Sequence, residues 1–397
     1  MRTAVVVGAG VGGLAAAGAL GRSGWHVTLI EREDRLRGAG AAMLVWPKGR
    51  AALEALGLSI GDVAFPMATG GIRRPDGRWL IESGDPAAAP QPVVVHSDDL
   101  HDALMAGLND NVEIRTGLEI TAVRAAPAER PAVGTGKHTF EGDLIVAADG
   151  SRSAIRRRLA PQATVVAAGY TAWRAVIPWF RAPKLAEGTP SASQLLGAGL
   201  GFLHASLGDR GTAGGSARGG IYWVATAPGA QRPEPPQTQL NLLRRWFGDW
   251  SSPVGDLLDA TEPGDLVQQA GEELRPLPAR FGYPVGVGGF VLLGDAAHVA
   301  TPNLTQGACL ALEDAVTLRS LVRDSQPGRT LPLALEEYST VRWPRVARVA
   351  RASRRLGVLL QAQGRLTVRA RDAALGRLPA GLLDRATTAA HDWTPPA

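Results

Sequence analysis

The first 31 residues carry the pattern that most restricts the possible fold. A short apolar run at 3–7 leads into the glycine-rich string GAGVGG at 8–13, and small residues typical of a helix continue to about residue 22. A second apolar run at 26–30 ends on Glu31. This order predicts a strand, a glycine turn, a helix and a second parallel strand, which is how an α/β fold with a dinucleotide site begins.

Each glycine of this turn has a predicted purpose. Gly8 permits the tight turn, Gly10 lets the backbone approach a pyrophosphate, and Gly13 lets the helix pack closely on the strand. Gly12 is the remaining glycine of the motif and is included in the predicted site. The N–H groups at the start of the helix would face the phosphates. Glu31 stands 18 residues after Gly13, where an acid accepts hydrogen bonds from ribose hydroxyls and disfavours a 2′-phosphate.

Two later segments repeat the arrangement of a strand, an acidic residue and a helix. The string AADGSRSAIR at 147–156 places Asp149 at such a junction, and LLGDAAHVATPNLTQGACLALEDA at 292–315 places Asp295 at another. Either acid alone could simply cap a helix or form a turn. Three junctions of this kind in one chain argue against coincidence.

Composition limits the classes of function. The chain has 397 residues, 45% of them hydrophobic and 20% charged, and its net charge of +5 is carried almost wholly by arginine. These values describe an ordinary globular protein, and without a basic block interleaved with aromatics we predict no nucleic-acid partner. Cys309 is the only cysteine, which excludes an intrachain disulfide and a cysteine-based metal site, and we predict no metal. We also expect a cytoplasmic protein without a membrane span, because neither a signal-type segment nor a run of roughly 20 apolar residues is present.

The middle of the chain changes character. The stretches 169–180, 193–208 and 219–229 read as alternating strands between Gly and Pro breaks, which predicts an antiparallel sheet. A helical pattern follows at 240–250, and residues 288–298 return to the pattern of a buried parallel strand. The sheet is therefore interpreted as an insert within the first α/β domain.

These observations define the fold that we predict. It is α/β, with a Rossmann-like dinucleotide domain assembled from 1–164 and 275–330. The inserted antiparallel sheet over 165–274 would form the substrate domain, and 331–397 would form a helical C-terminal part.

In order and spacing, three strings resemble the motifs of FAD-dependent aromatic hydroxylases of the p-hydroxybenzoate hydroxylase type: GAGVGG with Glu31, ADGSRSAIR, and GDAAHVATPNLTQGACLALEDA. Two further strings, GAAMLVWPKGRAALEALGL and AGYTAWRAVI, are more similar to the urate- and salicylate-hydroxylase-like branch. The resemblance extends to about residue 345. It implies that FAD is bound, that NADH or NADPH reduces it, and that O₂ then oxygenates a small aromatic substrate through a flavin hydroperoxide.

The resemblance also implies which residues hold the cofactor. The first motif would bind the ADP part, the segment of Asp149 is associated with both FAD and NAD(P)H, and Asp295 would hold the ribityl or pyrophosphate part. The helix after Pro302 would point its N-terminus at the flavin ring, where a nearby negative charge is stabilised by roughly 0.3–2 kcal/mol. The full predicted set is Gly8, Gly10, Gly12, Gly13, Glu31, Arg32, Arg37, Val123, Asp149, Asp295, Pro302, Thr305, Gln306, Gly307 and Ala308.

Two positions depart from the family pattern. Ser97 stands where the family usually has an arginine that contacts FAD, and Thr305 replaces the first glycine of the usual P-x-x-G-Q-G. A threonine adds a Cβ where the loop approaches the flavin, so we expect flavin mobility, coupling or pocket shape to differ.

Candidate substrate contacts come from two parts of the chain. Val45 and Trp46 lie where the family loop passes the flavin ring, and each is either a pocket wall or a core residue. In the string GYTAWRAVI, a period of two places Tyr170 and Arg174 on one face. Arg174 would bind an anionic substrate or pair with a neighbouring acid, and Tyr222 is either a core aromatic or a ligand.

The remaining conspicuous residues are interpreted as structural. His298 and Cys309 are assigned to packing, and the basic string RVARVARASRRLG at 345–357 to a solvated amphipathic face rather than to a membrane or partner contact. No side chain is assigned as catalytic, since the flavin would carry the chemistry. A flavin oxidase or dehydrogenase of the same fold and a catalytically silent FAD-binding protein stay as alternatives, and the protein would be a monomer or homodimer.

Overall fold

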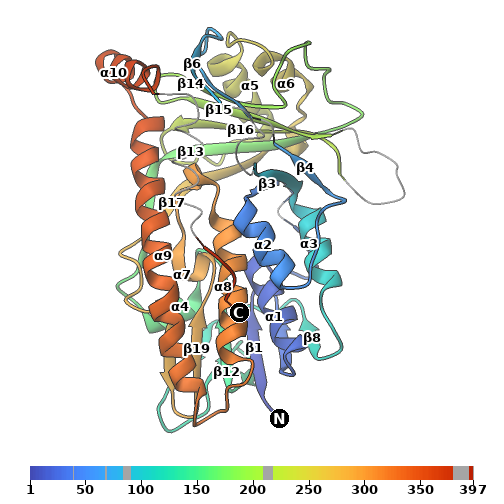
Figure 1. Ribbon diagram of the computed structural model, residues 1–397, viewed down its shortest axis with the longest axis vertical. Helices are drawn as coiled ribbons and strands as arrows, with labels where there is room; N and C mark the ends of the chain where they lie inside the picture. The colour runs from blue at the N-terminus through green and yellow to red at the C-terminus, as the bar shows by residue number, and fades with distance from the viewer. Residues whose placement is uncertain (39, 68, 84–90, 209–217, 379–392, 397) are drawn as a thin grey trace.

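Two large sheets stacked along the long axis of the molecule organise the computed structural model. The structure describes residues 1–38, 40–67, 69–83, 91–208, 218–378 and 393–396. Figure 1 shows the sheet that contains the first strand, β1 (Thr3–Val7), in the lower half and the large sheet of the middle segment above it, with the long helix α9 (Leu331–Leu360) running beside both. Within these ranges, no helix is long and apolar enough to cross a membrane.

The lower sheet has six strands in the order β18-β19-β12-β1-β2-β8. All neighbours are parallel except the antiparallel pair β18–β19. The register pairs Val7 of β1 with both Ile30 and Ala147, and Ala147 with Leu292, so four strands end at one edge. The bounds are β1 (Thr3–Val7), β2 (His26–Ile30), β8 (Val112–Arg115), β12 (Leu144–Ala147), β18 (Gly282–Val285) and β19 (Gly288–Leu292).

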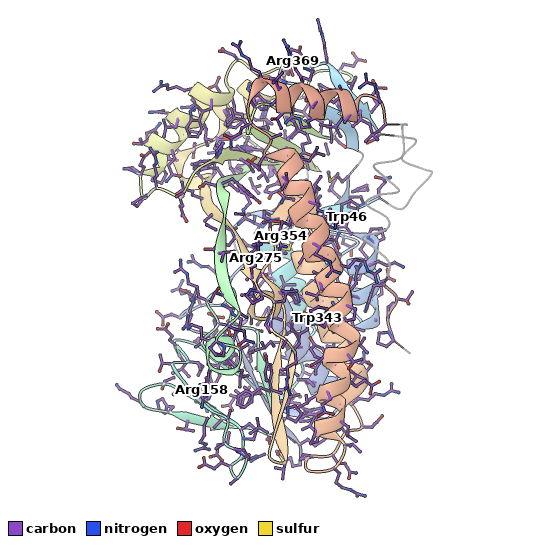
Figure 2. The ribbon with its side chains drawn as sticks, turned by 90° about the vertical axis from the view of Figure 1, so that its left-hand side faces the viewer. Trp46, Arg158, Arg275, Trp343, Arg354 and Arg369 are labelled. Carbon is purple, nitrogen blue, oxygen red and sulfur yellow. The ribbon has the colours of Figure 1, made fainter. Side chains whose placement is uncertain are left out.

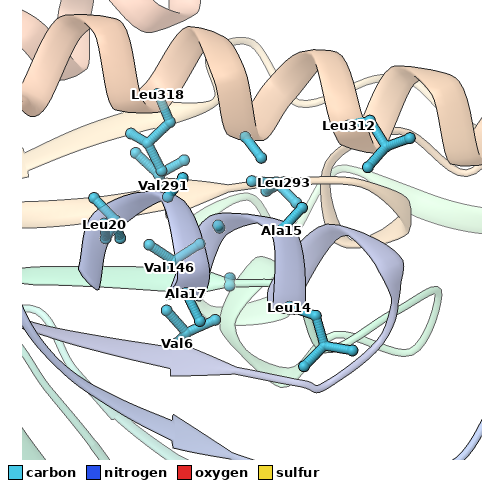
Figure 3. Packing of buried hydrophobic residues seen from close by; sticks show 14 of the residues in the cluster. Val6, Leu14, Ala15, Ala17, Leu20, Val146, Val291, Leu293, Leu312 and Leu318 are labelled. Carbon is cyan, nitrogen blue, oxygen red and sulfur yellow. The ribbon is translucent and has the colours of Figure 1, made fainter. Parts of the chain in front are cut away.

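Two helices rich in small residues cover this sheet. Figure 3 shows α1 (Val11–Arg22) packed between the strands and α8 (Gly307–Val322), with Ala17 beside Val6 and Val146. Alanine and glycine allow this close approach, because a Cβ built on Gly12 would lie 2.4 Å from Leu293 Cδ2 and 3.2 Å from Ala311 Cβ. Burying such a continuous apolar layer supplies most of the driving force for folding.

The upper sheet has seven strands in the order β17-β13-β16-β15-β14-β5-β6. One of its faces is covered by α5 (Pro236–Phe247) and α6 (Val254–Ala260), whose leucines pack with Trp173, Phe202 and Trp223. The opposite face meets a small sheet of the lower half, in the order β3-β7-β4. The bounds are β5 (Thr69–Arg73), β6 (Trp79–Glu82), β13 (Thr164–Pro178), β14 (Ala192–Leu196), β15 (Gly201–Gly208), β16 (Gly220–Pro228) and β17 (Val267–Arg275), with β3 (Ala42–Val45), β4 (Ala64–Pro66) and β7 (Val93–His96) in the small sheet.

Short elements complete the described fold. They are α2 (Pro47–Ala55), α3 (Ser97–Ala106), β9 (Ala122–Arg124), β10 (Ala132–Gly134), β11 (Thr139–Glu141), α4 (Ala154–Leu159), α7 (Asp295–His298), α10 (Arg365–Leu375) and the 3-10 helices η2 (Pro263–Asp265) and η3 (Pro302–Leu304).

The predicted fold class is confirmed, with one refinement of the upper sheet. It takes β5 and β6 from the segment 69–82, and β14 pairs with β5 in parallel, so the sheet is mixed rather than purely antiparallel. The sequence pattern around TGGIR is too short to reveal a partner more than 100 residues away. Part of the predicted C-terminal segment, 379–392 and 397, lies outside the described residues.

Candidate active site

The carboxyl-terminal edge of the lower sheet is where the three predicted junctions meet. Because β1, β12 and β19 end in register, the segments that begin at Gly8, Ala148 and Leu293 leave the sheet side by side. Ala148 N donates to Val7 O at 2.8 Å, and Leu293 N donates to Ala147 O at 2.9 Å. Ligands of open α/β sheets bind at this edge, so the topology brings the sequence motifs into one site.

The first junction has the geometry that its glycines predict. Gly8 has φ +102°, and an added Cβ would lie 2.2 Å from Ala148 O; at Gly13 it would lie 1.8 Å from Gly8 O. An added Cβ at Gly10, by contrast, meets nothing within 4 Å. The N-terminus of α1 has no side-chain cap, and Glu31 Oε2 accepts from Ala9 N at 2.7 Å. This turn therefore combines open space at Gly10, free N–H groups at the N-terminus of α1 and the carboxylate of Glu31, as a nucleotide site requires.

The second junction uses its acid as a helix cap. Asp149 Oδ2 accepts from Ala154 N at 2.8 Å, and Ser153 Oγ accepts from Arg156 N at 2.9 Å at the start of α4. Burial raises the pKa of Asp149 against the lowering effect of these hydrogen bonds. Its second oxygen, Oδ1, is buried without a partner among the described residues, and such an atom is expected to have one.

The third junction begins with Asp295, directly after the left-handed Gly294 at φ +58°. The Asp295 side chain is exposed, while Ala296, Ala297 and His298 after it are buried. Neighbouring atoms crowd the carboxylate enough that desolvation raises its pKa, with the charges of His298 and Arg156 acting in the opposite direction.

The loop that follows ends at the N-terminus of α8. Pro302 is exposed and starts η3, and Gln306 is the N-cap residue, without a side-chain capping bond to α8. An added Cβ on Gly307 would meet nothing within 4 Å. The first turn of α8 thus offers backbone donors to an open space, as the first turn of α1 does.

Thr305 is the one non-glycine residue with a positive φ in the part of the chain that the structure describes, at φ 52° and ψ 30°. A β-branched residue in this conformation costs on the order of 1–3 kcal/mol. Its hydroxyl accepts from Trp46 Nε1 at 2.8 Å and donates to Leu304 O at 2.8 Å. The departure from glycine at this position therefore creates a specific bond to the segment after β3.

A buried charge network supports the third junction, and we did not predict it from the sequence. Asp314 Oδ2 accepts from Gly294 N at 2.9 Å and is 2.7 Å from His298 Nε2, and its Oδ1 accepts from Arg342 Nε at 2.7 Å. Arg342 and Arg345 both bind Glu313, and all five side chains are almost completely buried. Arg342 lies on the apolar stripe of α9 with Leu335, Tyr338 and Val349, and this position is the signal that marks it as buried.

This network corrects the interpretation of the basic string at 345–357. Arg351 and Arg355 are exposed, as expected of a solvated face, but Arg345 is 5% exposed and ion-paired with Glu313. Arg354 is half-buried and its Nε lies 2.7 Å from Glu273 on β17, next to Arg275 (Figure 2). The structural interpretations of His298 and Cys309 agree with their burial.

The face of the upper sheet opposite α5 and α6 carries the candidate substrate contacts. The predicted alternation is present: Arg174 and Tyr222 lie on this face, and Trp173 and Trp223 pack on the helix-covered face. Tyr222 is buried, and its pKa is raised by burial while hydrogen bonding and the charge of Arg174 act to lower it. Arg174 Nη2 also donates to Gln269 Oε1.

This face is not fully covered. Gln194, Leu203, Val224 and Thr226 are half-exposed, although the alternate positions of their strands are buried against α5 and α6. The half-exposed positions are mainly apolar with a few polar groups, which is the usual lining of a small-molecule site. We call this side of the sheet its open face.

The other predicted residues fall into three environments. Val45 is fully buried in the main core, whereas Trp46 is half-buried. Val123 is half-buried on β9 and packs against the core, and Ala308 is half-buried in the first turn of α8. Arg32 and Arg37 are exposed, and Arg32 Nε is 3.4 Å from Glu33.

Ser97 is hydrogen-bonded to the segment before β3. Ser97 Oγ accepts from Ala41 N at 3.1 Å, and Ser97 N donates to Ala41 O at 2.7 Å. The residue is therefore used to join α3 to the segment before β3. Nearby, Arg218, which precedes β16, binds Asp99 and Asp102 of α3.

The fold and these junctions are those of an FAD-dependent oxidoreductase. Residues 1–217 and 279–353 match the family described as FAD binding domain, which shows that the chain belongs to it. It is an FAD-dependent monooxygenase, and three of its relatives and structural neighbours illustrate how far the similarity extends.

Aurachin C monooxygenase/isomerase of Stigmatella aurantiaca is 28% identical over 403 residues, covering 99% of this chain and 98% of its own. The 3-amino-4-hydroxybenzoate 2-monooxygenase of Streptomyces cremeus is 31% identical over 360 residues, with coverage of 88% and 86%. The structure of Klebsiella pneumoniae HpxO complexed with FAD and uric acid aligns with a TM-score of 0.81 and 26% identity, covering 98% of this chain and 96% of HpxO.

The described residues fit FAD. Gly10 and Gly307 face open space at two uncapped helix N-termini, of which one suits the pyrophosphate of FAD and the other suits a flavin ring that becomes anionic on reduction. Glu31 at the first end and Asp295 at the other add acceptors for hydroxyl groups. The junctions thus supply backbone donors and carboxylate acceptors at two separate places along one long ligand.

Proposed function

We propose that the chain is an NAD(P)H- and O₂-dependent aromatic hydroxylase that inserts one oxygen atom into a small ring substrate. In the overall reaction, substrate, O₂, NAD(P)H and a proton give hydroxylated product, water and NAD(P)⁺. FAD supplies the redox and oxygen-transfer chemistry when it is bound. The observation that carries the proposal is the meeting of three junctions at one sheet edge below the open face of the upper sheet.

In this proposal the protein positions the cofactor through its backbone. The N-terminus of α1 holds the pyrophosphate, Glu31 binds the ribose, and Asp295 binds the ribityl or pyrophosphate part of FAD. The first turn of α8, at Gln306, Gly307 and Ala308, faces the ring with N–H groups. A fixed positive dipole end is worth most where negative charge develops and water is excluded.

The proposed substrate carries an acidic or phenolic oxygen on an aromatic ring. Arg174 is hydrogen-bonded to two neutral side chains, Gln269 and Tyr222. An anionic group on the substrate would therefore balance its positive charge. The relatives are named for substrates of this kind, among them 3-amino-4-hydroxybenzoate and urate. A monomeric or homodimeric protein in the cytoplasm belongs to the same proposal.

The experiment that tests this function measures NADH and NADPH oxidation by the FAD-loaded protein against hydroxybenzoates, purines, quinolones and phenols. We expect one class to stimulate oxidation and to yield a product heavier by one oxygen atom, labelled when ¹⁸O₂ is used. Stimulated oxidation with hydrogen peroxide as the only product across the whole panel would contradict hydroxylation and favour an oxidase.

Arg174→Ala is expected to raise KM for the best substrate by roughly 10- to 100-fold, because a hydrogen bond to a charged group is lost. The FAD content should not change. Arg174→Lys should restore only part of the affinity, since a point charge lacks the planar fork of guanidinium.

Gln269→Ala is the matched control, because it removes the neutral partner and leaves the cation. It should change KM less than Arg174→Ala does. A lower melting temperature with unchanged KM in Arg174→Ala would remove Arg174 from the substrate site.

A further inference from the structure

Trp46 lies at the point where the lower half of the molecule meets the upper sheet. It follows β3 directly and is the N-cap residue of α2, with an extended backbone at φ −75° and ψ 163°. Strand side chains alternate, so Trp46 continues the side of Ala42 and Leu44, which pack with Tyr222 on the open face of the upper sheet. Figure 2 shows Trp46 at the height of Arg354, below the upper sheet.

The same residue is bound to the segment at the start of α8 by two groups. Its indole Nε1 donates to Thr305 Oγ1 at 2.8 Å, and its backbone N is 3.4 Å from Cys309 Sγ. Cys309 is fully buried, so the backbone contact fixes where α2 begins relative to α8. The indole is therefore held by Thr305, just before α8, whereas β3, which precedes Trp46, packs against the upper sheet.

Thr305 is committed to this contact. Both hydrogen-bonding directions of its hydroxyl are used, one toward Trp46 and one toward Leu304 O. The residue keeps a left-handed backbone that glycine would adopt without strain. A strained threonine in such a position indicates that its side chain has a purpose there.

We propose that the indole of Trp46 shields the reacting site from water near the N-terminus of α8. Thr305 holds the indole in place through its hydrogen bond. The proposal rests on the proposed function, because the N-terminus of α8 is where we place the flavin ring. Excluding water from that place strengthens the electrostatic contacts and limits side reactions. Trp46 and Thr305 are positioning residues rather than catalytic ones.

A double-mutant cycle on the cofactor-free protein tests the pair by itself. Trp46→Phe keeps a ring but removes the N–H, and Thr305→Val keeps the shape but removes the hydroxyl. Each should lower the melting temperature by about 1–2 °C, and the double variant should be no lower than the worse single variant. Additive shifts would show that the bond does not exist in solution and would overturn the proposal.

Iodide quenching of the fluorescence of bound FAD tests the shielding without any substrate. Thr305→Val should increase the quenching constant, because the indole loses the hydrogen bond that holds it in place, and Thr305→Ser should stay near the parent value. Thr305→Gly is the decisive comparison. It should melt higher than Thr305→Val because strain is relieved, yet show the same increased quenching because the hydroxyl is absent.

Equal quenching in Thr305→Val and Thr305→Ser would overturn the shielding role even if the cycle shows coupling. With a substrate from the panel, the peroxide-to-product ratio should rise in the same order as the quenching. Failure of every substrate would count against the proposed function alone, because the melting cycle and the quenching are measured without one.

Discussion

Gly10→Val is expected to give a folded protein that no longer holds FAD. Gly10 has φ −74° and ψ −176°, which any residue adopts, and a Cβ built there meets nothing within 4 Å. The added side chain therefore costs the fold little but enters the space through which a pyrophosphate approaches the backbone. We expect FAD affinity to fall about 100-fold or more, measured by flavin released on gel filtration and by titration of the cofactor-free protein.

Gly307→Val tests the second clamp in the same way, because its Cβ also meets nothing within 4 Å. Gly264→Val, at an equally open position in η2 that belongs to neither junction, is the matched control and should keep FAD. Gly13 is unsuitable, since its Cβ would lie 1.8 Å from Gly8 O and the fold itself would be damaged. Retention of stoichiometric FAD by both Gly10→Val and Gly307→Val would show that the cofactor does not lie between the two helix N-termini.

The parts of this fold that were predictable are those in which local pattern and topology agree. The junctions at Gly8, Asp149 and Asp295 each combine a buried strand, a turn and a helix start. A few residues are therefore enough to predict a strand–turn–helix junction at each of them. Their meeting at one edge follows from parallel pairing, which places the carboxyl ends of strands together. The face shared by Tyr170 and Arg174 follows from alternation in the same way.

What was missed depends on contacts between distant segments. Ion pairs connect α9 to α8, among them Arg345 with Glu313 and Arg342 with Asp314. The sequence of either helix alone does not show which residue of the other helix it pairs with. A basic residue on a helix is usually solvated, so the burial of Arg345 was not expected. The bond between Trp46 and Thr305 joins positions 259 residues apart and was equally beyond local patterns.

Arg342→Met is expected to lower the free energy of unfolding by about 3–5 kcal/mol, because removing one member of a buried ion network leaves the other charges uncompensated. Arg342 is 0% exposed and donates to Asp314, Glu313 and Leu310 O. Arg351→Met, on the exposed face of α9, is the control and should change stability by less than about 0.5 kcal/mol. Denaturant titration measures both, and a loss below about 1 kcal/mol in Arg342→Met would contradict the inferred role.

The same variant should also change the response to acid. Burial would raise the pKa of Asp314, but the charges of His298 and Arg342 and their hydrogen bonds overcome this and lower it from 3.8 to about 2. A carboxyl whose pKa is lowered by folding stabilises the protein above its unfolded pKa. That contribution, about 2 kcal/mol, is lost as the pH falls from near 4 through 2.

Without Arg342 the folded pKa of Asp314 should move back toward the ordinary value, so this part of the acid dependence should become shallower. Asp314 binds Gly294 N directly before Asp295, and FAD release should therefore accompany the loss of stability. Stability of the parent and of Arg342→Met measured between pH 5 and 2 decides the point. Parallel pH profiles would show that Arg342 does not hold the Asp314 carboxylate in its charged form.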